Sequence, residues 1–173
     1  MATPTAPAVP VLNLTDLAAA CPPDTAWMGL DLGETTIGVA TSDTSRMIAS
    51  PLELIRKSKF TAEAQALFRL MDHRKVSALV IGLPVNMDGT EGPRAQSCRA
   101  FARNLDRIRP VNVAFWDERL STSAVERFLI DELDLSRKRR AGVVDRTAAA
   151  WILQGALDRV RHNPLPPRSG EGG

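Results

Sequence analysis

Residues 27–43 read WMGLDLGETTIGVATSD and decide the fold, because two short apolar runs flank a polar turn that contains a glycine. This pattern predicts a β-hairpin. Side chains alternate along a strand, so one face of its first strand carries Gly29, Asp31 and Gly33. The opposite face carries the large apolar side chains Met28, Leu30 and Leu32. Asp31 is therefore a carboxylate in an apolar strand, between glycines that leave open backbone for another group to approach closely.

Asp31 needs a partner if it is buried. An unpaired carboxylate inside a protein costs several kcal/mol, so a cation, a metal ion or a buried hydrogen-bond donor is expected beside it. The alternative is that Asp31 ends the strand and caps a turn. The hairpin segment alone leaves both interpretations open.

Composition predicts one domain with a substantial core, since the chain has 173 residues and 44% hydrophobic content. Residues 1–24 are rich in Ala, Pro and Thr, and we expect them to form a disordered extension. The domain is expected over residues 25–162, followed by a disordered tail at 163–173. No Lys or Arg occurs in the first 24 residues, which argues against a secretory signal or a mitochondrial transit peptide.

Cysteine and histidine content narrows the chemistry. Cys21 falls in the expected extension and Cys98 on the apolar face of a predicted helix, so no disulfide is expected and the cytoplasm is the expected location. With only His73 and His162, neither a zinc cluster nor a histidine-based catalytic site is expected. No apolar run approaches the roughly 18 residues that cross a bilayer, so no membrane association is expected.

The net charge of +2 hides an uneven distribution. Residues 46–173 hold all 22 basic residues and 15 of the 20 acidic ones, a formal charge of +7. A basic surface around an acidic pocket would suit an enzyme that cuts phosphodiesters. Most of the basic residues are Arg, which binds phosphate with two hydrogen bonds, although a GC-rich genome would also favour Arg.

Five strands and four helices are predicted after the extension, in the order β-β-β-α-β-α-β-α-α. The third strand, at 47–55, is expected at a sheet edge because Pro51 interrupts it. The later elements are a helix at 61–73, a buried strand at 78–81, a helix from Pro93 to 108, a strand at 111–116, a helix opened by Ser123 and Glu126, and a helix at about 142–160. This order predicts an α/β fold with a five-stranded mixed sheet, its first three strands antiparallel, and helices on both faces.

Three acids lie at the ends of predicted elements: Asp31 on the first strand, Glu118 after the fifth, and Asp145 in the first turn of the last helix. Each has a structural alternative. Glu118 could pair with Arg119 at the surface, and Asp145 could favour the positive end of its helix. Asp117 and Glu118 point to opposite faces, so only one can join Asp31, and alternation does not say which.

Several motifs resemble, in order, those of the YqgF family, also called RuvX or pre-16S rRNA nucleases and related to the RuvC Holliday junction resolvases. The first is Asp31-x-Gly33 with 37–40 and Ser42-Asp43. The others lie at 82–93 with Ala95-Gln96, at 116–122, at 135–138, and at 144–154. Together they cover roughly residues 26–160. One departure is visible: Thr36 stands just before Ile37, where family members usually carry Lys or Arg, and Glu34 adds a negative charge. That departure puts part of the substrate contact in doubt.

The resemblance implies a ribonuclease-H-like fold, which agrees with the predicted strand order. It also implies that Asp31, Glu118 and Asp145 are catalytic carboxylates that bind Mg²⁺ or Mn²⁺. The chemistry suits such a set, because Mg²⁺ takes oxygen ligands and two ions about 4 Å apart can activate water and stabilise the leaving oxygen.

Nucleic-acid contacts are expected from the loop at 86–92 and from basic residues around the site: Asn86, Arg94, Arg119, Arg137, Lys138, Arg139 and Arg140. The loop would bring backbone close to nucleic acid near a helix N-terminus, although Asp88-Gly89 is also an ordinary turn. The basic run could be a solvated loop. Its place directly before the helix that carries Asp145 favours phosphate contact.

The leading hypothesis is a metal-dependent endonuclease for structured nucleic acid, with 5′-end maturation of pre-16S rRNA in ribosome biogenesis as the role that the family implies. Its partners would be pre-rRNA or ribosomal precursor particles. The same site could instead resolve branched DNA, since both substrates present phosphates. A third possibility is a non-catalytic nucleic-acid-binding factor in ribosome assembly or transcription. Residues 31–36 also resemble the phosphate loop of actin-like and sugar-kinase-like ATPases, which need a second domain.

Overall fold

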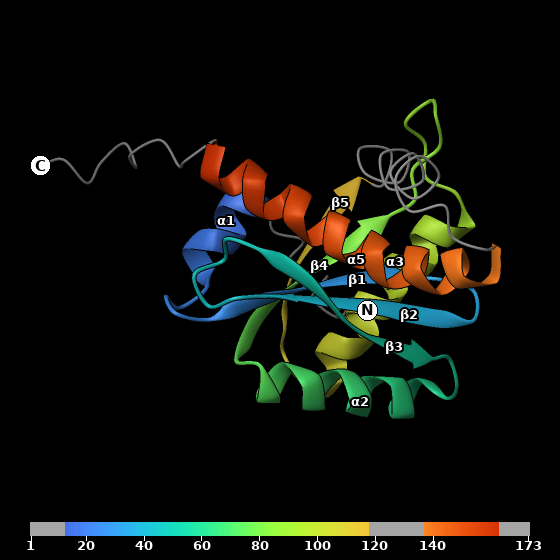
Figure 1. The fold of residues 1–173 in the computed structure, drawn as a ribbon, viewed down its shortest axis with the longest axis horizontal. Coiled ribbons are helices and arrows are strands. Elements are labelled where there is room, and N and C mark those ends of the chain that lie inside the picture. The colour runs from blue at the N-terminus through green and yellow to red at the C-terminus, as the bar shows by residue number, and fades with distance from the viewer. Residues whose placement is uncertain (1–12, 118–136, 163–173) are drawn as a thin grey trace, which may run out of the picture.

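A computed structural model describes residues 13–117 and 137–162, and within the last helix it describes side chains from 147 to 161. Figure 1 shows a sheet with helices on both faces. The elements are α1 (Leu14–Ala20), β1 (Ala26–Leu32), β2 (Thr36–Ser42), β3 (Ala49–Arg56), α2 (Phe60–His73), β4 (Val76–Leu83), α3 (Pro93–Ile108), β5 (Asn112–Asp117) and α5 (Arg137–His162).

The five strands form one mixed sheet in the order β3-β2-β1-β4-β5. β1 pairs antiparallel with β2, β2 pairs antiparallel with β3, and β1, β4 and β5 run parallel. This is the ribonuclease-H-like arrangement, so the predicted fold class is confirmed. Because β1, β4 and β5 are parallel, their carboxyl ends lie at the same edge of the sheet. Residues that follow these strands are therefore brought together.

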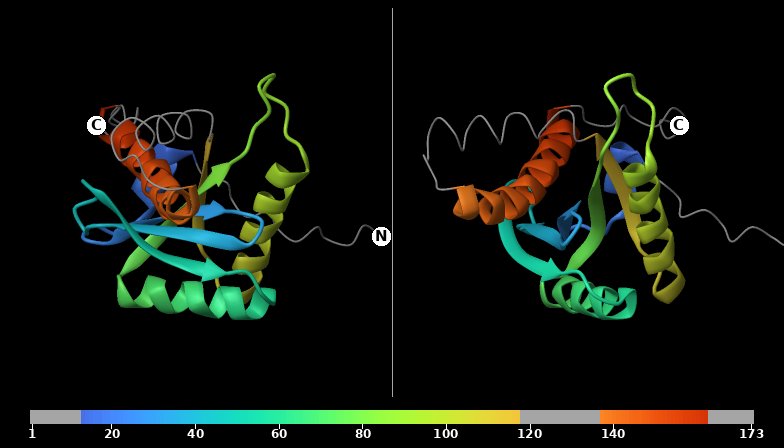
Figure 2. Two further views of the ribbon diagram at one scale, coloured as in Figure 1. Left: turned by 45° about the vertical axis from the view of Figure 1, so that its right-hand side comes forward. Right: turned by 90° about the vertical axis from the view of Figure 1, so that its right-hand side faces the viewer.

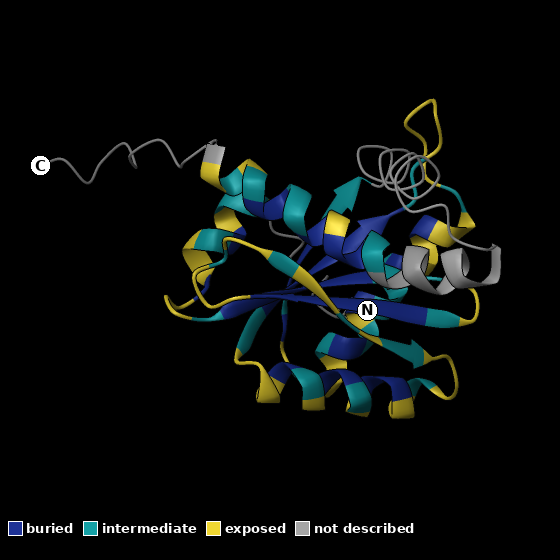
Figure 3. Ribbon diagram, viewed as in Figure 1, coloured by how far each residue is buried: buried dark blue, intermediate teal, exposed yellow. Residues whose placement is uncertain are grey.

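Two apolar cores lie on opposite faces of the sheet. Met28 and Leu30 pack on the face that α2 and α3 cover, whereas Trp27 packs on the face that α5 covers. The predicted alternation along β1 is therefore confirmed. The central strands are buried on both faces (Figure 3). Cys98 and Cys21 belong to different cores, and both are buried free thiols, so the sheet separates them.

The helix α1 corrects the prediction for the N-terminal segment, because residues 14–20 are a packed helix rather than part of a disordered extension. The side chain of Asn13 caps it by accepting a hydrogen bond from the Asp16 N–H at 2.8 Å. Leu17 is fully buried in the core beneath α5. This helix has seven residues and buries one large side chain, so its sequence shows no repeating apolar pattern from which a helix could be predicted. Residues 1–12 and 163–173 lie outside the described residues, as does the helix predicted after Ser123.

The last helix begins earlier than predicted. It starts at Arg137 rather than near 142, so the basic run 137–140 forms the first turn of α5 instead of a preceding loop. Arg and Lys are good helix formers, and the apolar pattern used for the prediction does not register an exposed first turn. None of the described helices is both long and apolar enough to cross a membrane.

Candidate active site at the carboxyl end of the central strands

Asp31 is the next-to-last residue of β1, the middle strand of the sheet. It pairs with Gly38 on β2 and is only partly buried. Alternation places it on the same face as Trp27 and Gly29, the face that α5 covers. Asp31 is paired with β2 on one side, and Leu30 just before it is the last residue of β1 that pairs with β4, so the carboxylate extends from an ordered part of the sheet.

Gly29 explains the open backbone beside Asp31. A Cβ atom there would lie 2.6 Å from the carbonyl oxygen of Ala149 and 2.7 Å from the Cβ of Leu153. The group that approaches β1 closely at this residue is therefore α5 itself. Gly33 has another role, since its N–H donates a hydrogen bond to the carbonyl oxygen of Thr36 at 2.9 Å across the β1–β2 turn.

The contacts between α5 and β1 have a definite direction. Leu157 and Trp27 line the same small cavity, whereas Leu153 and Ala149 meet Gly29, two residues further along β1. Residue numbers on the helix therefore fall as those on the strand rise. Figure 1 shows α5 crossing this face of the sheet.

Asp145 lies within α5, but its side chain is outside the described part of the helix. The sequence predicts Asp145 in the first turn of its helix. Since α5 begins at Arg137, Asp145 is instead in the third turn. The helix dipole acts mainly within the terminal turn, so attraction to the positive end of the helix no longer accounts for this acid.

Asp117 is the last residue of β5, and Glu118 lies outside the described residues. Val113 packs in the core under α2 and α3, whereas Ala114 and Trp116 pack under α5. Alternation from these residues places Asp117 on the face opposite to that of Asp31. Within 13–117 and 147–161, no three Asp, Glu, His or Cys side chains gather as a metal site would require. Two of the three predicted ligands, Glu118 and Asp145, are outside these side-chain ranges.

The loop after β4 is a tight, hydrogen-bonded turn that projects from the carboxyl edge of the sheet (Figure 2). The Asn86 N–H donates to the carbonyl oxygen of Thr90 at 2.8 Å, and the Asn86 side-chain amide donates to the Thr90 hydroxyl at 3.0 Å. Gly89 has a φ of 88°, which favours glycine. Asn86 therefore orders the loop, and Met87 at its tip is 90% exposed.

An ion pair fastens this loop to α3. The Arg99 guanidinium donates to both carboxylate oxygens of Glu91, at 2.7 and 2.8 Å, and lies 4.9 Å from the ring centre of Phe115. The hydrogen bond to Arg99 lowers the pKa of Glu91. Exposed pairs contribute little to stability, but two hydrogen bonds fix an orientation.

The predicted nucleic-acid contacts are only partly described. Arg94 is exposed at the second position of α3, and Arg119 lies outside the described residues. The backbone of residues 137–140 is described, without their side chains. Sequence interpretation missed three residues that line a pocket at this end of the sheet: Lys57, Glu63 and Phe101. Phe101 was one of the apolar positions of a predicted helix, and that pattern does not show whether a residue lines a pocket or packs in the core.

Three motif residues have structural roles in the turn between β2 and β3. The Ser42 hydroxyl accepts a hydrogen bond from the Trp27 N–H at 2.9 Å. The Asp43 carboxylate accepts hydrogen bonds from the N–H groups of Met47 and Ile48, at 2.8 and 3.0 Å. These bonds lower the pKa of Asp43, and the bond from Ile48 has the larger effect. The third, Gln154 on α5, reaches the same turn. Ser42 and Asp43 therefore order this end of the sheet, and Gln154 ties α5 to it.

We expect Gln154→Ala to lower the free energy of unfolding by about 1 kcal/mol, because it removes two hydrogen bonds to backbone groups that are part-buried or exposed. Gln154 accepts from the Ala49 N–H at 2.8 Å and donates to the Met47 carbonyl oxygen at 3.0 Å. Urea unfolding would measure the loss. Gln154→Glu keeps the acceptor but replaces the amide that donates to Met47 and Asp158 with a carboxylate, so it should also be destabilised. An unchanged unfolding midpoint in Gln154→Ala would contradict this role.

A sequence model of the RuvX family, described as Holliday junction resolvase, matches residues 25–159. The chain belongs to the RuvX family. The resemblance seen in the motifs is therefore confirmed over most of the chain. The region that matches the RuvX family runs from just before β1 into the last turns of α5.

Curated relatives of this RuvX chain match along nearly their whole length. A Phenylobacterium zucineum protein named "Putative pre-16S rRNA nuclease" is 66% identical over 153 residues, covering 88% of this chain and 98% of its own. A Caulobacter vibrioides protein of the same name is 62% identical over 154 residues, covering 88% and 99%. Thermus thermophilus RuvC in complex with a Holliday junction substrate aligns at a TM-score of 0.48 and 14% identity, over 79% of this chain and 96% of that one.

Proposed function

We propose that this RuvX chain is a divalent-metal-dependent nuclease that hydrolyses phosphodiester bonds in structured nucleic acid, with pre-16S rRNA as its substrate. The observation that carries the proposal is the place of Asp31, at the carboxyl end of the central strand and on the face that α5 covers. Membership of the family and the names of the close relatives support the same function.

The register of α5 on β1 supports Asp145 as a partner of Asp31. Leu157 lies near Trp27, and Leu153 and Ala149 meet Gly29. The residues of α5 that precede Ala149 therefore lie toward the carboxyl end of β1, where Asp31 is, and Asp145 is one turn before Ala149.

The alternation of β5 supports Glu118 over Asp117 as the third acid. Trp116 packs under α5 and Asp117 follows it on the other face. If the extended backbone continues by one residue, residue 118 returns to the face of Asp31. Of the two acids that the sequence left open, this alternation favours Glu118.

These residues suit Mg²⁺ or Mn²⁺, because the donors are carboxylate oxygens and both are ions that oxygen ligands favour. Asp31, Glu118 and Asp145 would hold the metal. When bound, the metal supplies an activated water near neutral pH and stabilises the leaving oxygen. The contribution of the chain is positional: strand pairing fixes the Asp31 backbone, and the close contact at Gly29 fixes the height of α5 above it.

Basic residues around this edge are proposed to hold the nucleic-acid backbone. They are Arg94, Arg119, Arg137, Lys138, Arg139 and Arg140. Asn86 is proposed to keep the projecting loop in a shape that nucleic acid can approach, since it bonds Thr90 through both its backbone and its side chain. Thr36, at the start of β2, offers no charge where relatives with Lys or Arg would contact phosphate.

The test is cleavage of a labelled pre-16S rRNA fragment beside a four-way DNA junction. Preferred cleavage of the RNA would support the proposal. Branched DNA is the second candidate substrate, favoured by the description of the matching family model, and preferred cleavage of the junction would select it. Binding without cleavage of either would instead indicate a non-catalytic factor.

Metal removal should abolish cleavage. We expect EDTA to reduce the rate to background, and excess Mg²⁺ or Mn²⁺ to restore it, because the proposed mechanism takes its activated water from the metal ion. Gel analysis of the labelled RNA measures the effect. Undiminished cleavage in EDTA would contradict the metal-dependent mechanism.

A further inference from the structure

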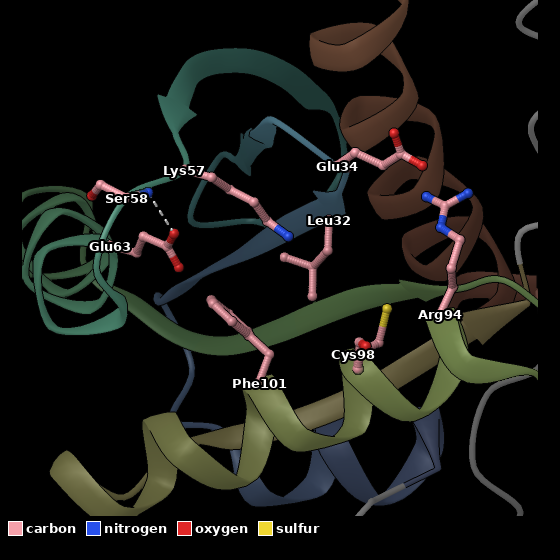
Figure 4. A pocket seen from close by; sticks show the side chains of 10 residues that line it. Leu32, Glu34, Lys57, Ser58, Glu63, Arg94, Cys98 and Phe101 are labelled. Carbon is pink, nitrogen blue, oxygen red and sulfur yellow. Dashed lines mark hydrogen bonds between the residues drawn. The ribbon is translucent and has the colours of Figure 1, made fainter.

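A pocket of about 390 Å³ opens beside the proposed site, on the opposite face of β1. Its volume lies in the range of about 300–1,000 Å³ typical of small-molecule sites. Leu32 and Gly33, which directly follow Asp31, form one end of it. The remaining walls come from the segment after β3, the start of α2 and the first half of α3 (Figure 4).

The floor of the pocket is apolar. Leu32 and Phe101 project into it from β1 and α3 (Figure 4). The ring of Phe101 is held edge-on by Phe60, with ring centres 5.6 Å apart and an interplanar angle of 86°. Cys98, on α3 between Phe101 and Arg94, adds a buried side chain to the same wall (Figure 4). A flat, apolar group would therefore find a preformed aromatic contact here.

The upper walls carry polar groups of both charges. Lys57 extends its amine into the pocket, and Arg94 stands at the end nearer to α5, across from Glu34 (Figure 4). Among the described residues, neither Lys57 nor Arg94 forms an ion pair. Both cations are exposed and so can bind an anion from outside the chain.

Glu63 is the most buried polar group of the pocket, with 6% of its surface exposed. One carboxylate oxygen accepts a hydrogen bond from the Ser58 N–H at 2.9 Å, which holds the side chain at the wall (Figure 4). The second oxygen can accept from a donor inside the pocket. Ser97 donates its hydroxyl to the carbonyl oxygen of Pro93, at 3.1 Å, and keeps its own oxygen as an acceptor.

We infer that this pocket binds one unpaired nucleotide of the substrate, next to the bond that is cut; the inference rests on the proposed function. A nucleotide combines an anion with a flat ring that has polar edges, and the pocket offers cations, an aromatic floor and polar walls. The phosphate lies toward Arg94 and Lys57, and the base lies against Phe101 and Leu32. A paired base would first have to leave its stack, so the substrate is one with an unpaired nucleotide at the cut.

Binding can be tested without cleavage. We would titrate the full chain with AMP, GMP, CMP and UMP, and separately with ribose 5-phosphate, by amide NMR. At least one mononucleotide should shift signals of the pocket residues and bind at least tenfold more tightly than ribose 5-phosphate, because base stacking on an aromatic ring adds affinity. Equal affinity of ribose 5-phosphate, or shifts confined to residues elsewhere, would overturn the inference.

Two variants and one control identify the pocket. Phe101→Leu keeps an apolar side chain but removes the ring, and should weaken mononucleotide binding about tenfold. Lys57→Ala removes a cation and should also weaken it. Lys59→Ala removes a nearby cation that does not line the pocket, and should leave binding unchanged. Equal affinities in all four proteins would contradict the assignment.

A cleavage arm separates this inference from the proposed function. We would prepare a series of substrates, each with one abasic nucleotide at a different position around the cut. Wild type should cut one of them about tenfold more slowly than the intact substrate. Phe101→Leu should cut that same substrate no more slowly than wild type does. Normal cutting of every abasic substrate by wild type would overturn the inference and leave the nuclease proposal intact. If wild type cuts nothing, the nuclease proposal fails, and the NMR titration alone decides whether the pocket takes a nucleotide.

Discussion

Asp31→Asn is expected to reduce nucleic-acid cleavage by more than about 100-fold. Groups that merely support a metal ligand contribute about 10–100-fold, so loss of a ligand charge should exceed that range. The change removes one negative charge and keeps the shape of the side chain, which is only partly buried. Single-turnover cleavage at saturating Mg²⁺ is the measurement, with thermal unfolding to verify that the variant folds.

Asp117→Asn is the matched control. Asp117 ends β5 at the same edge of the sheet, and alternation from Val113 and Trp116 places it on the other face. It should therefore retain most of the wild-type rate. If Asp31→Asn and Asp117→Asn lost activity equally, the face of the sheet on which each acid lies would not matter for cleavage. The proposed ligand set would then be wrong. Full activity in Asp31→Asn would end the nuclease proposal as stated.

Gly29→Ala should lower the free energy of unfolding by about 3 kcal/mol, near the upper end of the usual cost of overpacking a core. The new methyl group would meet the Ala149 carbonyl oxygen and the Leu153 Cβ, at 2.6 and 2.7 Å. Neither atom belongs to the free end of a side chain, so α5 as a whole would have to lift from the sheet. Denaturant unfolding measures the loss of stability.

The same variant should also lose activity in the fraction that remains folded, because α5 carries Asp145. Gly155→Ala provides the comparison, since its Cβ would lie 2.7 Å from an atom at the edge of the Trp116 ring. A ring can turn aside, and Ala in a helix gains about 1 kcal/mol over Gly. We therefore expect a much smaller loss. Equal losses would show that the contact at Gly29 is not special.

Much of the fold could be predicted from the hairpin sequence and the alternation of apolar runs. The face assignment of β1 is confirmed because a buried strand must keep its large side chains in register with two cores. The pattern missed α1, where one buried leucine, Leu17, is the anchor. It also placed the start of α5 too late, because the first turn has charged residues and no apolar stripe.

The candidate site was less accessible to sequence reasoning. Asp31 stood out because a carboxylate between glycines breaks an apolar strand. Which of Asp117 and Glu118 joins it depends on the face of Trp116, and that follows only from packing. The nucleotide pocket left no signal at all, because Lys57, Glu63 and Phe101 come from three separate elements and each has an ordinary local role.

The contact between Gly29 and Leu153 joins the first strand of the domain to its last helix. The core on that face of the sheet is therefore closed by the last described segment of the chain. A chain that ended before residue 137 would leave Trp27, Ala40 and Val80 of that core without the helix that covers them.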